Sequence, residues 1–264
     1  MARLRLTYKA FLLIGVSLLL GAGQRAAAQG SEHYISQPWE VTWQLREWQK
    51  DYDALVAALR ENTPKSNKHV RKRAHALYED ILDHAIHGPE FFETVGRFLT
   101  VLAISEVRLG DRDAGAWHWQ MAQSVFPELR KSSFEEVPDV APFMKDSLVM
   151  ERGSEDLLRF SNGASGEEMR CPGSVHPAVP KTEVPARYPA GLGRYKVAGT
   201  PFVRTVIDIE GKAHEPVVEK GSGFVSFDLA AMECLRNWVF EPAMCGGRPI
   251  PAYMTVSVEF GKRH

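Results

Sequence analysis

The clearest pattern of apolar and polar positions lies near the C-terminus, in residues 252–260. Apolar side chains fall on one face and polar ones on the other, as Ala252, Met254, Val256, Val258 and Phe260 against Tyr253, Thr255, Ser257 and Glu259. A period of two is typical of a strand with one buried and one solvated face. The pattern therefore predicts a half-buried strand that closes the chain's last folded region.

The residues before this strand predict a hairpin followed by a helix. Apolar residues alternate over 202–209, a turn follows at Gly211, and 216–220 forms the partner strand, with Pro216 at its start or near a sheet edge. The helix covers 228–238, with Ser226 or Asp228 as its N-cap. The order strand, strand, helix, strand predicts a small α+β domain with an antiparallel three-stranded sheet packed on a helix.

Upstream, apolar residues recur at three- and four-residue spacing and predict four helices. The first carries apolar positions over 43–59 and the second over 70–85, with Thr63-Pro64 between them and Ser66 or Asn67 as N-cap. The third covers 91–109 and the fourth 113–125. Only a single short helix is predicted within 141–160.

The third and fourth helices resemble a tetratricopeptide unit, a helix–turn–helix repeat. Residues matching its register are Leu102, Ala103, Gly110, Asp111, Trp119, Ala122 and Pro127. Gly115 departs from it, because the repeat prefers alanine there. A lone unit cannot bury its apolar face, so all four helices are expected to pack together as an α-helical, tetratricopeptide-like domain.

These signals predict the organisation of the chain. Residues 1–28 form a signal peptide, 29–140 the helical domain, 141–180 a linker rich in Gly, Ser, Pro and Glu, and 181–262 the α+β domain. The basic start and the small residues at 26–28 predict cleavage after Ala28. The alternative is an uncleaved inner-membrane anchor, although the apolar run 10–22 is shorter than the roughly 20 residues that span a bilayer.

The net charge bears on the class of partner, and the cysteines bear on possible disulfides. The formal net charge of −1 gives no argument for nucleic-acid binding. Export permits a disulfide, and of the three cysteines Cys234 is expected to be a buried helix residue. Cys171 and Cys245 lie in loop-like sequence, so we predict that they pair.

The C-terminal region resembles the C-terminal domain of TonB-type energy transducers. The likeness rests on Tyr188-Pro189-Ala190, Gly211 at the hairpin, Leu235-Arg236-Asn237-Trp238, Phe240-Glu241-Pro242-Ala243, Gly247-Arg248-Pro249-Ile250 and the strand to Phe260. In that family the domain sits in the periplasm, and its last strand pairs with an extended segment of an outer-membrane receptor. The resemblance thus implies β-augmentation, in which backbone hydrogen bonds provide affinity and alternate side chains provide selectivity.

By this resemblance the last strand offers its edge to a peptide, and the expected partner-binding residues are Tyr188, Pro189, Tyr253, Thr255, Ser257 and Glu259. Tyr188-Pro189 is equally compatible with a simple entry turn. The chain departs from the family in lacking a long proline-rich spacer and in having a helical middle. The likeness therefore supports the fold and the binding mode more strongly than energy coupling.

Other conspicuous residues are expected to be structural. Asp80, His84 and His87 share a helical face, but a solvated helix end is favoured over a metal site. The basic cluster Lys65, Lys68, Arg71, Lys72 and Arg73 is favoured as a solvated face over an anion or acidic-partner site. Core packing is favoured over a ligand groove for Trp39, Trp43, Trp48, Trp117 and Trp119.

No pattern assigns a nucleophile, a base and an oxyanion donor, so we expect no catalytic site, metal or cofactor. The sequence predicts a periplasmic, non-enzymatic module that docks an extended peptide of an envelope partner, such as a TonB-dependent receptor, and acts as an accessory to transport. Neither nucleic acid nor a small-molecule substrate is expected. The alternative is an envelope scaffold that binds through its helices, with the C-terminal domain forming a homodimer.

Overall fold

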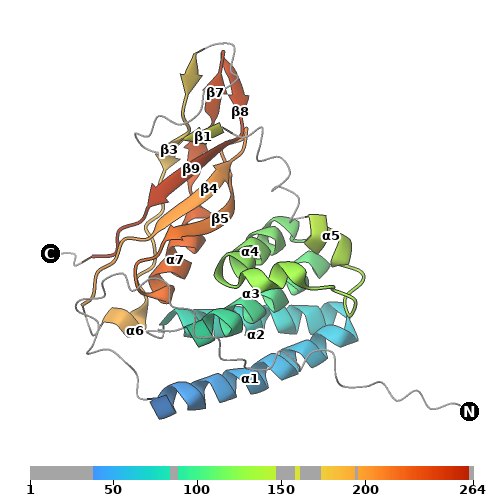
Figure 1. Ribbon diagram of the computed structural model, residues 1–264. Helices are drawn as coiled ribbons and strands as arrows, with labels where there is room; N and C mark the ends of the chain where they lie inside the picture. Colours follow the sequence, from blue (N-terminus) through green and yellow to red (C-terminus); the bar gives the residue numbers. More distant parts are fainter. Residues whose placement is uncertain (1–37, 84–88, 147–157, 161–173, 194–195, 262–264) are drawn as a thin grey trace, which may run out of the picture. The chain divides into compact units, whose positions relative to one another are not determined.

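The computed structural model describes residues 38–83, 89–146, 158–160, 174–193 and 196–261 (Figure 1). The helical part comprises α1 (Pro38–Glu61), α2 (Pro64–Asp83), α3 (Pro89–Arg108), α4 (Arg112–Val125), the 3-10 turn η1 (Pro127–Lys131) and α5 (Ala141–Asp146). The four long helices match the four predicted from apolar spacing. The predicted signal peptide lies outside the described residues. None of the described helices has the length and apolarity needed to cross a bilayer.

The remaining part contains short helices and three sheets. Its strands are β1 (Leu158–Phe160), β2 (Val175–His176), β3 (Val179–Thr182), β4 (Phe202–Ile207), β5 (Ala213–Lys220), β6 (Val239–Glu241), β7 (Ala243–Cys245), β8 (Arg248–Ile250) and β9 (Ala252–Ser257). The helices are α6 (Ala190–Gly193) and α7 (Val225–Leu235). The largest sheet has the order β1-β9-β4-β5, and the smaller ones are β2-β7-β8 and β3-β6. The overall class is α+β, as predicted.

The large sheet contains the predicted antiparallel core and one additional strand. β9 pairs antiparallel with β4, from Ile207↔Ala252 to Phe202↔Ser257, and β4 pairs antiparallel with β5. On its other side β9 pairs parallel with β1. The expectation that β9 lies at the sheet edge was therefore wrong for its first half, because Ala252–Met254 have β1 beside them.

Residues 158–160 and 175–182 also differ from expectation, since they form β1, β2 and β3 in a segment predicted to be loop or linker. β2 pairs with β7, and β3 pairs with β6. These strands are two to four residues long, which is too short for a period-two signal. Their pairing partners lie far along the chain, so local sequence does not reveal them.

The N-termini of α2 and α7 differ from the caps predicted from the sequence. α2 begins with a reciprocal cap, in which Ser66 N–H donates to Thr63 Oγ1 and Thr63 N–H donates to Ser66 Oγ, both at 3.0 Å. The predicted caps Ser66 and Asn67 were wrong, because Pro64 starts the helix one turn earlier. α7 has no side-chain cap, and Asp228 instead accepts bonds from the Ser222 N–H and hydroxyl.

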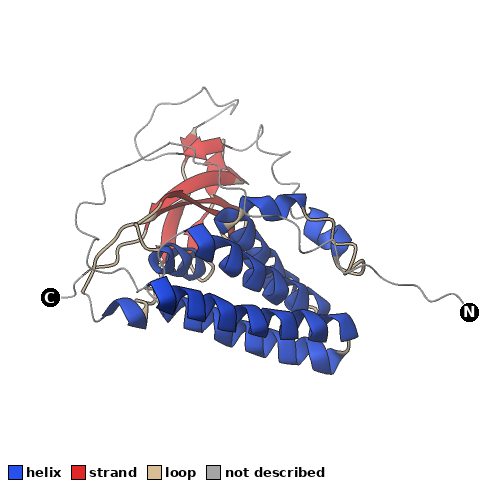
Figure 2. Ribbon diagram, turned by 60° about the horizontal axis from the view of Figure 1, so that its bottom comes forward, coloured by secondary structure: helices blue, strands red, loops and turns tan. Residues whose placement is uncertain are grey.

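Figure 2 shows the helices gathered together, with the strands beyond them. The helical part and the sheet part share one hydrophobic core. Trp48, Trp117 and Trp119 are buried in it, as predicted for core tryptophans. The two parts also make polar contacts. α4 supplies acceptors to β5: the Glu215 N–H donates to Gln120 Oε1 at 2.9 Å, and the Val218 N–H donates to Ser124 Oγ at 3.4 Å. α4 therefore covers the β5 edge of the sheet.

Candidate functional site

The register between β4 and β9 decides which backbone groups of β9 face away from β4. Phe260 exchanges two hydrogen bonds with Gly199, each 2.8 Å, and the Val258 N–H donates to the Pro201 carbonyl at 3.1 Å. This register continues without a shift through β9. Because bonding residues alternate in an antiparallel ladder, even-numbered residues of this strand face β4. The N–H and C=O groups of Tyr253, Thr255, Ser257 and Glu259 therefore point to the opposite side.

These four residues are among the six predicted from the sequence to contact a partner, the other two being Tyr188 and Pro189. We call their outward-facing backbone the β9 edge. Within it, Tyr253 has β1 as its neighbour, because Arg159 of β1 is its Cα partner. Among the described residues, no strand pairs with Thr255 or Ser257 on this side. β1 thus occupies the β9 edge at Tyr253, and the edge continues past β1 at Thr255, Ser257 and Glu259.

Side chains on the outer face form a network across three strands. The Arg204 guanidinium on β4 lies 4.8 Å from the centre of the Tyr253 ring. Arg204 Nε lies 3.1 Å from Glu219 Oε1 on β5, and the Thr255 hydroxyl donates to Glu219 Oε2 at 3.0 Å. Arg204 and Glu219 thereby fix the positions of Tyr253 and Thr255.

Tyr253 differs from the simple alternating pattern. It is 5% exposed, although it belongs to the polar face of the strand. Stacking beneath Arg204 accounts for part of this burial, since a guanidinium over an aromatic face makes a favourable cation–π contact. Ser257 and Glu259 are exposed, as the pattern predicted. A peptide at the β9 edge can therefore reach the side chains of Ser257 and Glu259 directly.

Tyr188 and Pro189 lie near the far end of β9 and help to build the domain core. The Tyr188 ring contacts Phe227 at 5.2 Å and Phe260 at 6.4 Å between ring centres. Its hydroxyl donates to the Val197 carbonyl at 2.7 Å, and burial raises the pKa of this phenol. Pro189 is buried. These contacts give Tyr188 and Pro189 a structural role, which is compatible with a simple entry turn. A role of the two residues in partner binding stays a proposal.

The start of the domain is also tied to α2. Arg187 Nη2 lies 2.6 Å from both carboxylate oxygens of Asp83, and its Nη1 contacts Glu79. The Ala190 N–H donates to Asp83 Oδ1 at 3.0 Å. The polypeptide beside Tyr188 is therefore held against the helical part.

The comparison with known families agrees with this geometry. A sequence model of the family described as Gram-negative bacterial TonB protein C-terminal matches residues 184–261. Residues 184–261 form a TonB C-terminal domain. This match contains β4, β5, α7 and β9, together with the Tyr188-Pro189 entry. It does not include α1 to α5 or β1 to β3.

Among characterised proteins, the chain is similar to Protein TonB of Vibrio cholerae serotype O1 (strain ATCC 39315 / El Tor Inaba N16961). The two are 25% identical over 84 residues, which cover 32% of this chain and 34% of the Vibrio protein. The chain thus spans about a third of the length of that relative.

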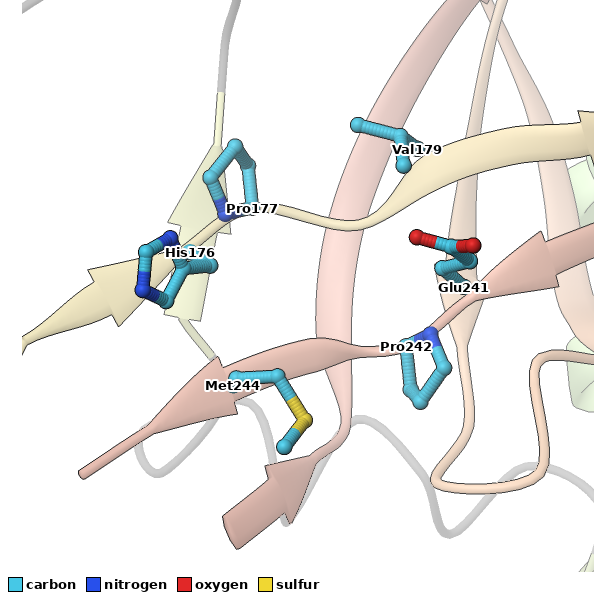
Figure 3. Close-up of a pocket in the computed structure, with 6 residues that line it drawn as sticks. All are labelled: His176, Pro177, Val179, Glu241, Pro242 and Met244. Atoms are coloured by element: carbon cyan, nitrogen blue, oxygen red, sulfur yellow. The ribbon is translucent and has the colours of Figure 1, made fainter. Parts of the chain in front are cut away.

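A shallow hollow of about 560 Å³ lies between β2–β3, which precede the matched residues, and β6–β7, which belong to them (Figure 3). Its lining combines apolar residues with one imidazole and one carboxylate: His176, Pro177, Val179, Glu241, Pro242 and Met244. Val179 and Glu241 are Cα partners, as are His176 and Met244. This lining does not assemble a nucleophile, a base and an oxyanion donor.

The remaining predicted site residues are only partly described. Cys245 is disulfide-bonded, and Cys234 is free and buried, but Cys171 lies outside the described residues. The pairing of Cys171 with Cys245 stays a prediction. His84 and His87 also lie outside the described residues. In the described part of the chain, no group of three or more His, Cys, Asp or Glu side chains is arranged to hold a metal.

Proposed function

We propose that this protein is a periplasmic, non-enzymatic docking module that binds an extended segment of an envelope protein at the β9 edge. The observation that carries this proposal is the outward direction of the backbone groups of Thr255, Ser257 and Glu259. Such groups are a template for an added strand. The TonB C-terminal domain supports the same mode of binding, and an outer-membrane TonB-dependent receptor is the partner class we expect.

The β9 edge provides a test that leaves the sheet intact. Replacing Ser257 with Pro removes an N–H that faces the partner, while the neighbouring bonds to β4 come from Val256 and Val258. Ser257→Ala is the matched control, because it changes the same side chain and keeps the N–H. Both variants are checked for an unchanged unfolding transition before use.

The assay is capture of proteins from an envelope extract on the immobilised chain, with identification by mass spectrometry. We expect Ser257→Ala to retain the partner and Ser257→Pro to lose it. Retention of the same partner by a folded Ser257→Pro protein would contradict docking at the β9 edge. N-terminal sequencing of the chain recovered from cells tests cleavage after Ala28 in the same preparation.

A second function is supported by the helical part, which we propose to be tetratricopeptide-like. Lys68, Arg71, Lys72 and His75 of α2 line a hollow of about 460 Å³ with Glu106 of α3. In the described part of the chain, Lys68, Arg71 and Lys72 have no carboxylate within 4.0 Å. This surface suits an acidic partner of an envelope scaffold, with the C-terminal domain as a dimer contact.

Charge reversal separates the two functions. Lys68→Glu combined with Lys72→Glu should abolish capture only if the helices bind the partner, whereas Lys65→Glu on the same helix serves as control. Sedimentation of the parent chain reports whether a dimer forms. A monomer that loses its partner through Ser257→Pro alone would exclude the scaffold function.

A further inference from the structure

The strand β1 lies where an added strand would lie. It pairs with β9 on the side opposite to β4, with Leu158↔Ala252, Arg159↔Tyr253 and Phe160↔Met254 as Cα partners. We propose that β1 is a built-in competitor that occupies the first part of the β9 edge until a partner strand displaces it. This inference rests on the proposed function of the β9 edge and adds its regulation.

The other edge of the sheet cannot take this role, because α4 covers it. Gln120 and Ser124 already accept bonds from two N–H groups of β5. Strand addition at the β5 side of the large sheet is therefore blocked, which leaves the side on which β1 and the β9 edge lie. β1 is the segment of this chain that the structure places there.

The pairing geometry identifies the atoms involved. The N–H and C=O of Tyr253 face β1, by the alternation of the β4–β9 ladder. In a parallel ladder these groups pair with the residues on either side of the Cα partner, which is Arg159. The N–H of Phe160 therefore faces the Tyr253 C=O. A partner strand needs this same carbonyl.

The length of β1 suits a competitor rather than a permanent strand. It has three residues beside a β9 strand of six. Strands in globular proteins usually have five or six residues, and parallel pairing is slightly weaker per residue than antiparallel pairing. A longer partner can pair along Thr255 and Ser257 as well, and so gains bonds that β1 does not make.

The expected effect follows from the fraction of molecules with a vacant edge, because apparent affinity falls in proportion to that fraction. One hydrogen bond contributes roughly a two- to tenfold change in an equilibrium constant. Phe160→Pro removes one donor and disfavours the extended pairing, so we expect about a tenfold gain in affinity for an added strand. Phe160→Ala is the matched control, since it keeps the N–H.

The probe is a fluorescent synthetic peptide with the sequence of residues 155–162, titrated into the exported full chain and followed by anisotropy. Phe160→Pro protein should bind it about tenfold more tightly than parent, and Phe160→Ala protein should bind it more weakly than Phe160→Pro protein. Equal affinities of parent and Phe160→Pro, or no binding by a folded Phe160→Pro protein, would overturn the inference.

A locked variant provides a second measurement. Phe160→Cys with Met254→Cys places cysteines at Cα partners, within the range that a disulfide spans. The oxidised form should exclude the peptide, and reductant should restore binding, with parent protein in the same reductant as control for Cys245. Unchanged binding by the oxidised form would contradict occupation of the edge by β1.

The two proposals fail in different ways. If Phe160→Pro binds the peptide more tightly but no envelope protein is lost on Ser257→Pro, the docking function fails and the β1 inference stands. If capture depends on Ser257 but Phe160→Pro leaves peptide binding unchanged, the β1 inference fails and the docking function stands.

Discussion

His118 of α4 lies 3.6 Å, from Nε2 to Oε2, from Glu233 of α7, and so links the helical part to the TonB C-terminal domain. Its Nδ1 lies 2.7 Å from Glu106 Oε2 on α3. Burial by itself lowers the pKa of His118, but the two carboxylates outweigh this effect and raise the pKa from 6.5 to about 9. His118 is therefore an imidazolium at neutral pH.

The raised pKa of His118 predicts a loss of stability in mild alkali. Because the pKa of His118 is higher in the folded state than in the unfolded state, protonation of His118 stabilises the folded protein. This stabilisation is complete below the unfolded pKa of about 6.5 and is lost as the pH rises through about 9. The shift in the pKa of His118 corresponds to roughly 3 kcal/mol. Urea unfolding at pH 6, 7.5 and 9.5 should show this decrease in the parent, and much less of it in His118→Gln.

His176→Gln is the control for that experiment, because His176 is exposed on β2. It should keep the pH dependence of the parent. A His118→Gln protein with the full parental decrease between pH 6.5 and 9 would show that other groups cause it.

Thiol counting tests the predicted disulfide. Cys234 is free, and burial, helped by the Glu233 carboxylate, raises its pKa to about 12. We expect no reaction of the native protein with a thiol reagent at pH 8, and one thiol per chain in denaturant without reductant. Cys234→Ser should then give none. Three thiols in the unreduced, denatured parent would exclude pairing of Cys171 with Cys245.

Replacing Gly211, in the turn between β4 and β5, is expected to lower the stability of the protein strongly. Its φ is +81°, and an added Cβ would lie 2.0 Å from the Phe240 carbonyl oxygen. Since the clash is with backbone, Gly211→Ala should cost about 3 kcal/mol or more. Gly247 has φ +82° with no atom within 4 Å of the added Cβ, so Gly247→Ala should cost only about 1 kcal/mol.

Both variants place alanine at a positive φ, but only Gly211→Ala also brings a Cβ against Phe240. Comparing their thermal and urea unfolding therefore separates the effect of the close approach from that of the backbone strain. The difference between them reports the contact of the hairpin with β6, where the Phe240 N–H donates to the Gly211 carbonyl at 2.9 Å. Equal destabilisation by both substitutions would show that the approach to Phe240 is not rigid.

The elements that could be predicted from the sequence are those with a pattern in neighbouring residues. The strand at 252–257, the hairpin and the four long helices all have repeated apolar positions or turn residues, and these were predicted. β1 has three residues and a partner almost a hundred positions away, so no local pattern could place it beside Tyr253. The burial of Tyr253 likewise depends on Arg204, which belongs to another strand. The candidate edge was therefore predictable, but its occupant was not.

Gly115 shows the same limit in the helical part, because it departs from the tetratricopeptide pattern for a tertiary reason. An added Cβ would lie 2.5 Å from Val107 Cγ2 and 3.0 Å from the Ala103 carbonyl oxygen on α3. Alanine favours helix over glycine by about 1 kcal/mol, but overpacking costs about 1–3 kcal/mol. We expect Gly115→Ala to lower the free energy of unfolding by about 1 kcal/mol.

Val107→Ala in the same chain removes the methyl group, so the double variant should lose less than the sum of the single losses. Urea unfolding of the four proteins measures this coupling. A Gly115→Ala protein as stable as the parent, with additive effects in the double variant, would mean that α3 and α4 are not packed this closely at Gly115.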